Sequence, residues 1–348
     1  MTMRLSSVRK TFGSHAALDD VSLEIDTGDF FVVLGPSGCG KSTLLRAIAG
    51  LEPIDSGDIH LAGTQVAGKG LHQPPEARNV GVVFQSYALW PHMSVRQNVA
   101  FPLETAKRAG SYVTARTNNC LETVELTPFA DRKPADLSGG QRQRVALARC
   151  LAQGARTVLM DEPLANLDPH LRSAMEEELA EFHKKSGSTT LFITHDQREA
   201  MALADKVALM WDGKVLQADT PEGLYDRPVN ERVAGFIGRS TILSGEILAV
   251  RGERALVSLA GHAVEIPCPP ETEIGMARII VRPEHVRTTG EDRDLETVVD
   301  RVTYRGGFWE ANVRLDGQEQ AVLVNIPHKA AAGDSLAIAI DGGWVLPA

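Results

Sequence analysis

The sequence predicts two parts of different fold class, an α/β part with a parallel sheet and then a small all-β barrel. In the first part, short uninterrupted apolar runs, typical of strands buried in a parallel sheet, alternate with helical patterns. Near residues 235–238 the pattern changes to short alternating runs separated by Gly, Pro and charged turns. We therefore expect one domain at 1–235 and a second, OB-like barrel at 236–348.

The first buried run, at 30–34, leads directly into GPSGCGKST at 35–43. This segment fits G-x-x-x-x-G-K-[ST] at a place where a strand turns into a helix, which favours a phosphate-binding P-loop over an ordinary glycine-rich turn. Backbone N–H groups and the positive end of the helix would surround phosphate oxygens, and Ser42 is placed to ligate Mg2+. The predicted nucleotide-binding residues here are Ser37, Gly38, Cys39, Gly40, Lys41, Ser42 and Thr43.

A second glycine-rich segment, LSGGQ at 137–141, precedes the helical stretch 142–149. Ser138 and Gln141 have the spacing of a capping box, and a simple N-cap would account for these two residues. Gly139 and Gly140 favour an additional role, because they leave backbone amides at a helix N-terminus accessible to an anion. We therefore expect a second phosphate-binding segment.

Polar side chains follow three further predicted strands. The run 157–160 ends in Asp161 and Glu162, and the run 189–193 is followed by Thr194 and His195. Carboxylates after a strand are often only solvated loop residues, but beside a P-loop Asp161 can hold Mg2+ and Glu162 can activate the water that attacks the γ-phosphate. His195 would contact the γ-phosphate and fix that water together with Glu162. Gln85, after the strand 80–84, is a further candidate ligand for Mg2+.

In order and spacing, these motifs resemble the ATPase subunits of ATP-binding-cassette (ABC) transporters, and the resemblance covers the whole chain. It implies a P-loop NTPase fold with a RecA-like ABC core, an antiparallel β subdomain and a helical subdomain at about 95–153. The matches are the adenine-stacking aromatic at Phe12 (usually Tyr), Walker A at 35–43, the Q-loop at Gln85, the signature at 137–141, Walker B at 158–161, the catalytic carboxylate Glu162, the D-loop at 165–168 (with Ala165 where Ser is more usual) and the switch histidine His195.

Composition limits the function classes. The chain has 36 Lys and Arg against 45 Asp and Glu, a formal charge of -9, without a long basic tract, so we expect no nucleic-acid partner. The four cysteines are scattered without metal-binding spacing, which fits a reduced, cytoplasmic compartment. No apolar stretch is long enough for a spanning helix, so we expect membrane association only through a partner.

Two segments indicate which branch of the family the chain resembles. VRPEHV at 281–286 is similar to a hallmark of the transport-associated OB (TOBE) domain, a regulatory domain of binding-protein-dependent importers. The barrel lacks the basic, aromatic face of a nucleic-acid-binding OB fold. The apolar loop SYALWPHMSV at 86–95 either packs Tyr87, Leu89 and Trp90 into a local core or forms a docking cleft for a permease helix.

The resemblance implies an ATPase that powers an importer from the cytoplasmic face of the plasma membrane. Its cofactors would be ATP and Mg2+, and its partners a second copy, transmembrane permease subunits and, indirectly, a solute-binding protein. In a head-to-tail homodimer, ATP at Lys41 of one copy would meet Ser138, Gly139 and Gly140 of the other. The implied solutes are ferric iron, polyamines or phosphonates, with sugars as the alternative. A soluble ABC ATPase of translation or DNA repair would have tandem cassettes or coiled-coil insertions, and a P-loop kinase or GTPase leaves 137–141 unexplained.

Overall fold

The computed structural model describes residues 2–165, 169–289 and 295–347, and it divides the chain into two compact units. The first unit ends at Pro221 and the second begins at Glu222. The predicted fold class is confirmed, with an α/β cassette followed by an all-β domain. The predicted boundary at 235/236 differs from the division at 221/222 by two short helices, which the structure groups with the second unit.

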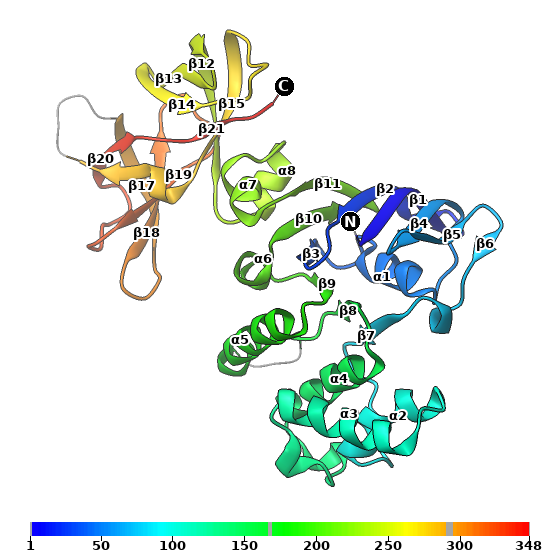
Figure 1. Cartoon of the computed structure of the whole chain (residues 1–348). Helices are drawn as coiled ribbons and strands as arrows, with labels where there is room; N and C mark the ends of the chain where they lie inside the picture. The colour runs from blue at the N-terminus through cyan, green and yellow to red at the C-terminus, as the bar shows by residue number, and fades with distance from the viewer. Residues whose placement is uncertain (1, 166–168, 290–294, 348) are drawn as a thin grey trace. The chain divides into compact units, whose positions relative to one another are not determined.

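A six-stranded sheet forms the centre of the first unit (Figure 1). Its neighbouring strands are parallel except for the antiparallel edge pair β10–β11. In spatial order the strands are β11 (Lys214–Asp219), β10 (Lys206–Trp211), β3 (Phe30–Leu34), β9 (Thr189–Thr194), β8 (Thr157–Asp161) and β7 (Val80–Val83). Every residue of β3 and β9 is buried, which explains their continuous apolar or β-branched sequences.

A second, antiparallel sheet of five strands lies in the same unit. Its order is β2 (His15–Ile25), β1 (Met3–Phe12), β4 (Ser56–Leu61), β5 (Thr64–Gly68) and β6 (Leu71–His72). The helix α1 (Lys41–Ala49) shares one hydrophobic core with both sheets, and its apolar side chains Leu44, Leu45 and Ile48 are fully buried. This core fixes the start of α1 against the carboxyl end of β3.

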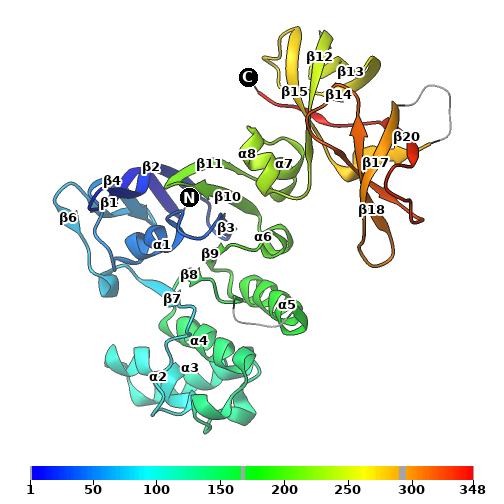
Figure 2. The same ribbon diagram turned by 180° about the vertical axis from the view of Figure 1, so that it is seen from behind.

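Helices α2, α3 and α4 pack mainly on one another, and α4 also lies beside β7 at the edge of the six-stranded sheet (Figures 1 and 2). They pack around a separate apolar core that includes Val95, Leu121 and Val145. This helical subdomain runs from the start of α2 to the end of α4, with α2 (Val95–Thr105), α3 (Gly110–Thr123), the 3-10 turns Thr127–Phe129 and Pro134–Asp136, and α4 (Gly139–Gln153).

The remaining helices of the first unit follow the sheet strands. α5 (Pro169–Ser186) comes after β8, α6 (Gln197–Leu203) comes after β9, and the 3-10 turn Pro75–Ala77 precedes β7. Among the described residues, no helix combines the length and hydropathy that crossing a bilayer requires. All four cysteines are free and buried.

The second unit is a nearly closed, all-antiparallel barrel of OB-like type, built on one apolar core. Thr241 and Gln318 join its two five-stranded sheets by hydrogen bonds between β12 and the segment around β18 and β19. The first sheet contains β14 (His262–Pro267), β13 (Arg254–Leu259), β12 (Thr241–Arg251), β15 (Gly275–Val281) and β21 (Trp344–Val345), and the second β16 (Val286–Thr288), β20 (Ser335–Ile340), β17 (Leu295–Tyr304), β18 (Trp309–Leu315) and β19 (Val322–Ile326).

Arg282 of the predicted 281–286 hallmark is a structural anchor in this unit. It is 2% exposed, although Arg is rarely buried. Its guanidinium donates to the carbonyl oxygens of Tyr225 and Ile237 and lies 3.6 Å from the centre of the Tyr225 ring. These contacts tie α7 (Pro221–Asp226) and the end of α8 (Glu231–Phe236) to the 3-10 turn Pro283–His285.

Candidate functional site

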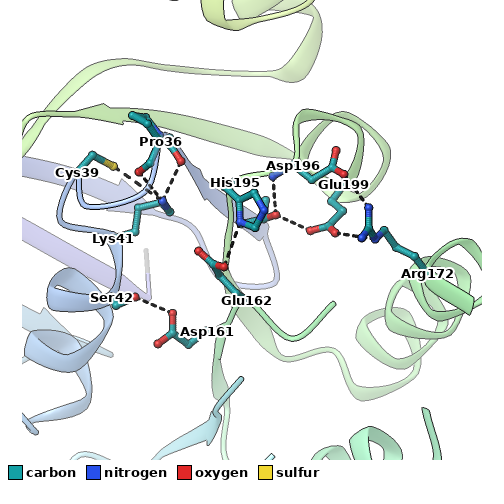
Figure 3. A network of polar contacts seen from close by, with 12 residues as sticks. Pro36, Cys39, Lys41, Ser42, Asp161, Glu162, Arg172, His195, Asp196 and Glu199 are labelled. Carbon is teal, nitrogen blue, oxygen red and sulfur yellow. Dashed lines mark hydrogen bonds and ion pairs between the residues drawn. The ribbon is translucent and has the colours of Figure 1, made fainter. Parts of the chain in front are cut away.

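Lys41 lies inside its own loop at the carboxyl end of β3. Its side chain is almost fully buried, and Nζ donates to the carbonyl oxygens of Gly35 at 2.8 Å and Pro36 at 2.9 Å (Figure 3). The Cys39 sulfur is 4.0 Å from the same nitrogen. A full positive charge therefore lies at the N-terminus of α1, where the free N–H groups and the helix dipole already favour an anion.

The conformation of this loop requires glycine at two positions. A Cβ at Gly40 would lie 2.1 Å from the carbonyl oxygen of Ala17, and one at Gly35 would lie 2.2 Å from that of Met210. Both residues also have positive φ, which L side chains rarely adopt. The loop is thus held tightly against β2 and β10.

Ser42 and Asp161 come together from α1 and the end of β8. The Ser42 hydroxyl donates to Oδ1 of Asp161 at 3.0 Å. Burial raises the pKa of Asp161, and the hydrogen bond from Ser42 offsets only part of this effect. A hydroxyl and a partly buried carboxylate are the hard oxygen ligands that Mg2+ takes, and Mg2+ usually binds through one or two carboxylates with water and phosphate completing its shell. The residues present therefore fit Mg2+.

Glu162 and His195 meet at the ends of the adjacent parallel strands β8 and β9, whose register pairs Asp161 with Ile193. His195 Nδ1 is 3.0 Å from Oε2 of Glu162, and in Figure 3 the two side chains point toward one another. Glu162 has a φ of 44° and donates its backbone N–H to the Ile193 carbonyl oxygen. A non-glycine residue in this left-handed conformation is strained, and such residues cluster at functional sites.

Phe12 ends β1 as an exposed aromatic, with 48% of its surface accessible. The Lys10 ammonium lies 5.0 Å from the ring centre and is also bonded to Glu52 at 2.7 Å. One face of a fixed aromatic ring is therefore available for stacking against a flat base.

The signature segment forms the predicted capping box. Oγ of Ser138 accepts from the Gln141 backbone N–H at 3.2 Å, and Oε1 of Gln141 accepts from the Ser138 N–H at 3.0 Å. Among the described residues, no hydrogen bond or ion pair joins 138–141 to the 35–43 loop of the same chain. The segment is thus a preformed helix N-terminus.

The loop after β7 divides into buried and exposed parts. Tyr87 is buried and Leu89 packs against the helical subdomain, as the local-core interpretation predicts, whereas Trp90 is 43% exposed. Gln85 is exposed, and its amide has no hydrogen-bond partner in the described part of the chain. Its role as a Mg2+ ligand stays a prediction.

Two groups of positioning contacts were not predicted from the sequence. Arg149 of α4 donates to the carbonyl oxygens of Tyr87 and Ala88, two non-glycine residues with positive φ. Arg172 of α5 contacts Glu199 behind His195. The one sequence signal for the second group is Glu199, a carboxylate on the buried side of the short helix α6. Of the predicted D-loop, residues 166–168 lie outside the described residues.

Comparison with known families gives two matches that together span most of the chain. The family described as "ABC transporter" matches residues 18–165, which contain Walker A, the signature and Walker B. The family described as "TOBE domain" matches residues 279–346, within the barrel.

Curated proteins and solved structures agree with these matches. The chain is 43% identical over 307 residues to the spermidine/putrescine import ATP-binding protein PotA of Chromobacterium violaceum, covering 87% of this chain and 83% of that protein. It is 42% identical over 324 residues to the sn-glycerol-3-phosphate import ATP-binding protein UgpC of Paracoccus denitrificans, covering 93% and 89%. Among solved structures, the dimeric ATP-binding cassette MJ0796, in a post-hydrolysis state bound to ADP and phosphate, superimposes with a TM-score of 0.55 at 32% identity, covering 63% of this chain and 98% of that one.

Proposed function

Because the chain belongs to the ATP-binding-cassette family, among import ATP-binding proteins with a TOBE domain, we propose that two copies of it hydrolyse ATP between them to drive import of a small solute. The observation that carries this proposal is the convergence of three groups at neighbouring strand ends. These are the buried Lys41 ammonium, the Ser42–Asp161 pair and the Glu162–His195 pair.

Each group has a distinct role in the proposed reaction. Lys41 exchanges its bonds to the carbonyl oxygens of its own loop for phosphate oxygens, and the amides of 37–43 hold the rest of the phosphate chain. Glu162 orients the attacking water and accepts its proton. His195 holds Glu162 through the 3.0 Å contact of Nδ1, and in its doubly protonated form it also donates from Nε2 toward the γ-phosphate.

Mg2+ would be held by Ser42 and Asp161, with Gln85 able to approach from the end of β7. When bound, the ion supplies charge neutralisation for the β- and γ-phosphates. Its charge would also offset the burial that raises the pKa of Asp161. Adenine would stack on the open face of Phe12.

A second copy would supply the missing part of each site. The preformed helix N-terminus at Ser138, with Gly139 and Gly140 next to it, offers free amides to a γ-phosphate bound at Lys41 of the other copy. Head-to-tail pairing then gives two equivalent composite sites. The dimeric state of the similar cassette MJ0796 supports this arrangement.

The exposed Trp90 would contact a transmembrane permease subunit, so that the chain works at the cytoplasmic face of the plasma membrane as a peripheral protein. A solute-binding protein outside the membrane would deliver cargo to that permease. Among candidate solutes we favour polyamines, because relatives named for spermidine and putrescine import recur among the similar proteins. The second candidate is glycerol phosphate, because one similar protein is named for import of sn-glycerol-3-phosphate. Ferric iron and phosphonates remain to be tested in the same assay.

Reconstitution tests this function. The chain would be assembled with candidate permease subunits and a candidate solute-binding protein, in vesicles loaded with ATP and Mg2+. Solute uptake and ATP hydrolysis should rise together for spermidine or putrescine, and both should be lost in Glu162→Gln. Hydrolysis that no candidate solute stimulates, with no uptake, would contradict transport coupling.

A further inference from the structure

His195 is exposed, yet the residues on either side of it are held by a buried polar network. The side chain of His195 is 51% exposed, and its described contact is the one to Glu162. An exposed imidazole with one hydrogen bond has considerable freedom, so its direction depends on the backbone that carries it. The backbone at this point passes from Thr194, the last residue of β9, to Asp196, the N-cap of α6.

Glu199 is the centre of this network. It lies on the first turn of α6 and is only 3% exposed, although ionisable carboxylates are seldom buried without a partner. Its Oε2 accepts from the Thr194 hydroxyl at 2.5 Å, and the Thr194 hydroxyl oxygen in turn accepts from the Asp196 backbone N–H at 2.9 Å. Both neighbours of His195 are therefore fixed through one carboxylate.

Arg172 connects this turn to a different helix. Its Nε lies 3.6 Å from Oε1 of Glu199, and its Nη1 donates to Oδ2 of Asp196 at 3.1 Å (Figure 3). Asp196 also accepts from the backbone N–H of Arg198, which caps α6. The guanidinium thus bridges two carboxylates, and its planar fork lets one side chain make both contacts.

Arg172 also connects the two chain segments that follow Glu162 and His195. On one side the chain runs from Glu162 at the end of β8 into α5, which carries Arg172. On the other side it runs from His195 at the end of β9 into α6, which carries Glu199. The β8–β9 ladder, with the Glu162 N–H bonded to the Ile193 carbonyl oxygen, sets the separation of the two strand ends. Arg172 joins α5 to the turn that follows His195, and so it holds the backbone that directs the imidazole.

We propose that Arg172 and Glu199 are positioning residues for hydrolysis, which act by holding His195 against Glu162. This inference rests on the proposed roles of Glu162 and His195. Arg172 and Glu199 contact Thr194, Asp196 and each other, on the His195 side of the site, so we assign the network to the step after nucleotide binding. Loss of either residue should lower kcat and leave the KM for ATP unchanged.

The kinetic test is a double-mutant cycle on the full-length protein. We expect Arg172→Ala and Glu199→Gln each to lower kcat about tenfold, with KM within about twofold of the wild type. Glu199→Gln retains an oxygen acceptor for Thr194, so it is the variant to use if Arg172→Ala does not fold. Arg172→Lys should recover part of the rate, since one ammonium can reach only one carboxylate at a time. Arg198→Ala is the matched control, because it removes an exposed charge next to the same Asp196 and should leave kcat within about twofold.

The decisive contrast is with His195→Ala. If the network acts through His195, Arg172→Ala should cause no further loss of kcat in that background. A second readout needs no activity: the Nδ1 chemical shift of His195 in Arg172→Ala should move toward its value in Glu162→Ala. Equal fractional losses in both backgrounds, or an unchanged shift, would overturn the inference. A wild-type rate that does not depend on His195 would instead contradict the proposed function.

Discussion

At the residue scale, the site contains charged groups in places where burial disfavours charge. Lys41 is nearly inaccessible and bonded to neutral carbonyl groups, and Asp161 is partly buried beside a neutral hydroxyl. Both arrangements cost stability in the nucleotide-free chain, because each charge gives up water without gaining an opposite charge within bonding distance. A ligand that supplies phosphate to one and a cation to the other removes this cost, which couples folding stability to nucleotide binding.

Asp161→Asn should make the nucleotide-free chain more stable and inactive. Burial raises the pKa of Asp161 above its unfolded value, so the ionised form at neutral pH destabilises the fold. Asn keeps an oxygen for Ser42 without the charge, and Tm should rise by about 1–3 °C. Calorimetry across pH checks this, since the difference should shrink as the pH falls through the raised pKa. A lower Tm for the variant at pH 7 would contradict the expectation.

Phe12→Ala should weaken ATP binding without slowing the chemical step. Removal of a stacking ring costs about 1–3 kcal/mol per base, so KM should rise about tenfold while kcat stays within about twofold. Phe12→Tyr, which keeps the ring, serves as the control in the same steady-state assay. An equal rise of KM in both variants would show that the ring face is not the binding surface.

At the element scale, the parallel sheet brings separate motifs into one site. The ends of β3, β8 and β9 lie side by side, so residues after each strand meet even though they are far apart in sequence. The motif positions were predictable because each motif directly follows a buried apolar run, and the carboxyl ends of such strands face the ligand crevice. Glu162 with His195 and Ser42 with Asp161 are the two pairs that this rule brings into contact.

The positioning contacts were not predictable in the same way. Arg149 clamps the backbone at Tyr87 and Ala88, and Arg172 bridges Glu199 and Asp196. In both cases an arginine on one helix reaches a loop or turn that local sequence does not place, so the pairing depends on how the helices pack. A helical pattern in the sequence predicts which face of a helix is buried. It does not predict which carbonyl oxygen or carboxylate an arginine on that helix will contact.

Trp90→Ala should uncouple the chain from its permease. The ring is exposed and packs only partly, with Phe101 at 5.6 Å between ring centres, so its removal leaves the fold and the basal ATPase intact. Stimulation of ATPase by the permease in vesicles should fall about tenfold or more. Tyr112→Ala, which removes another exposed aromatic of the same subdomain, is the control and should keep stimulation. Loss of basal and stimulated activity together would argue against docking.

At the scale of the whole molecule, the two units have separate cores, and the sequence boundary between them is open to test. The sequence predicts the boundary at 235/236, because the alternating strand patterns begin there. The barrel nevertheless buries Arg282 against Tyr225, and Trp344 donates to the Pro228 carbonyl oxygen. The segment with α7 and α8 thus supplies hydrogen-bond acceptors for side chains of the barrel. Local sequence patterns could not predict these contacts, because they join residues far apart in the sequence.

Truncation checks this relation. The fragment 222–348 should melt cooperatively, whereas 236–348 should melt about 10 °C lower, because Arg282 loses the Tyr225 carbonyl oxygen and ring. Thermal denaturation followed by circular dichroism on both fragments is sufficient. Equal melting temperatures would favour the boundary that composition predicts.

The central claim is that each ATP is held between Lys41 of one copy and the Ser138 segment of another. Light scattering with saturating ATP and Mg2+ tests this on three proteins: Glu162→Gln, and Glu162→Gln with a second change of Ser138 to Asn or to Asp. Asp and Asn both cap a helix, but only Asp places a negative charge against the partner's phosphate. We expect twice the mass of one chain for Glu162→Gln and for its Ser138→Asn derivative, and the mass of one chain for its Ser138→Asp derivative. A single-chain mass for all three, or a dimer for all three, would contradict it.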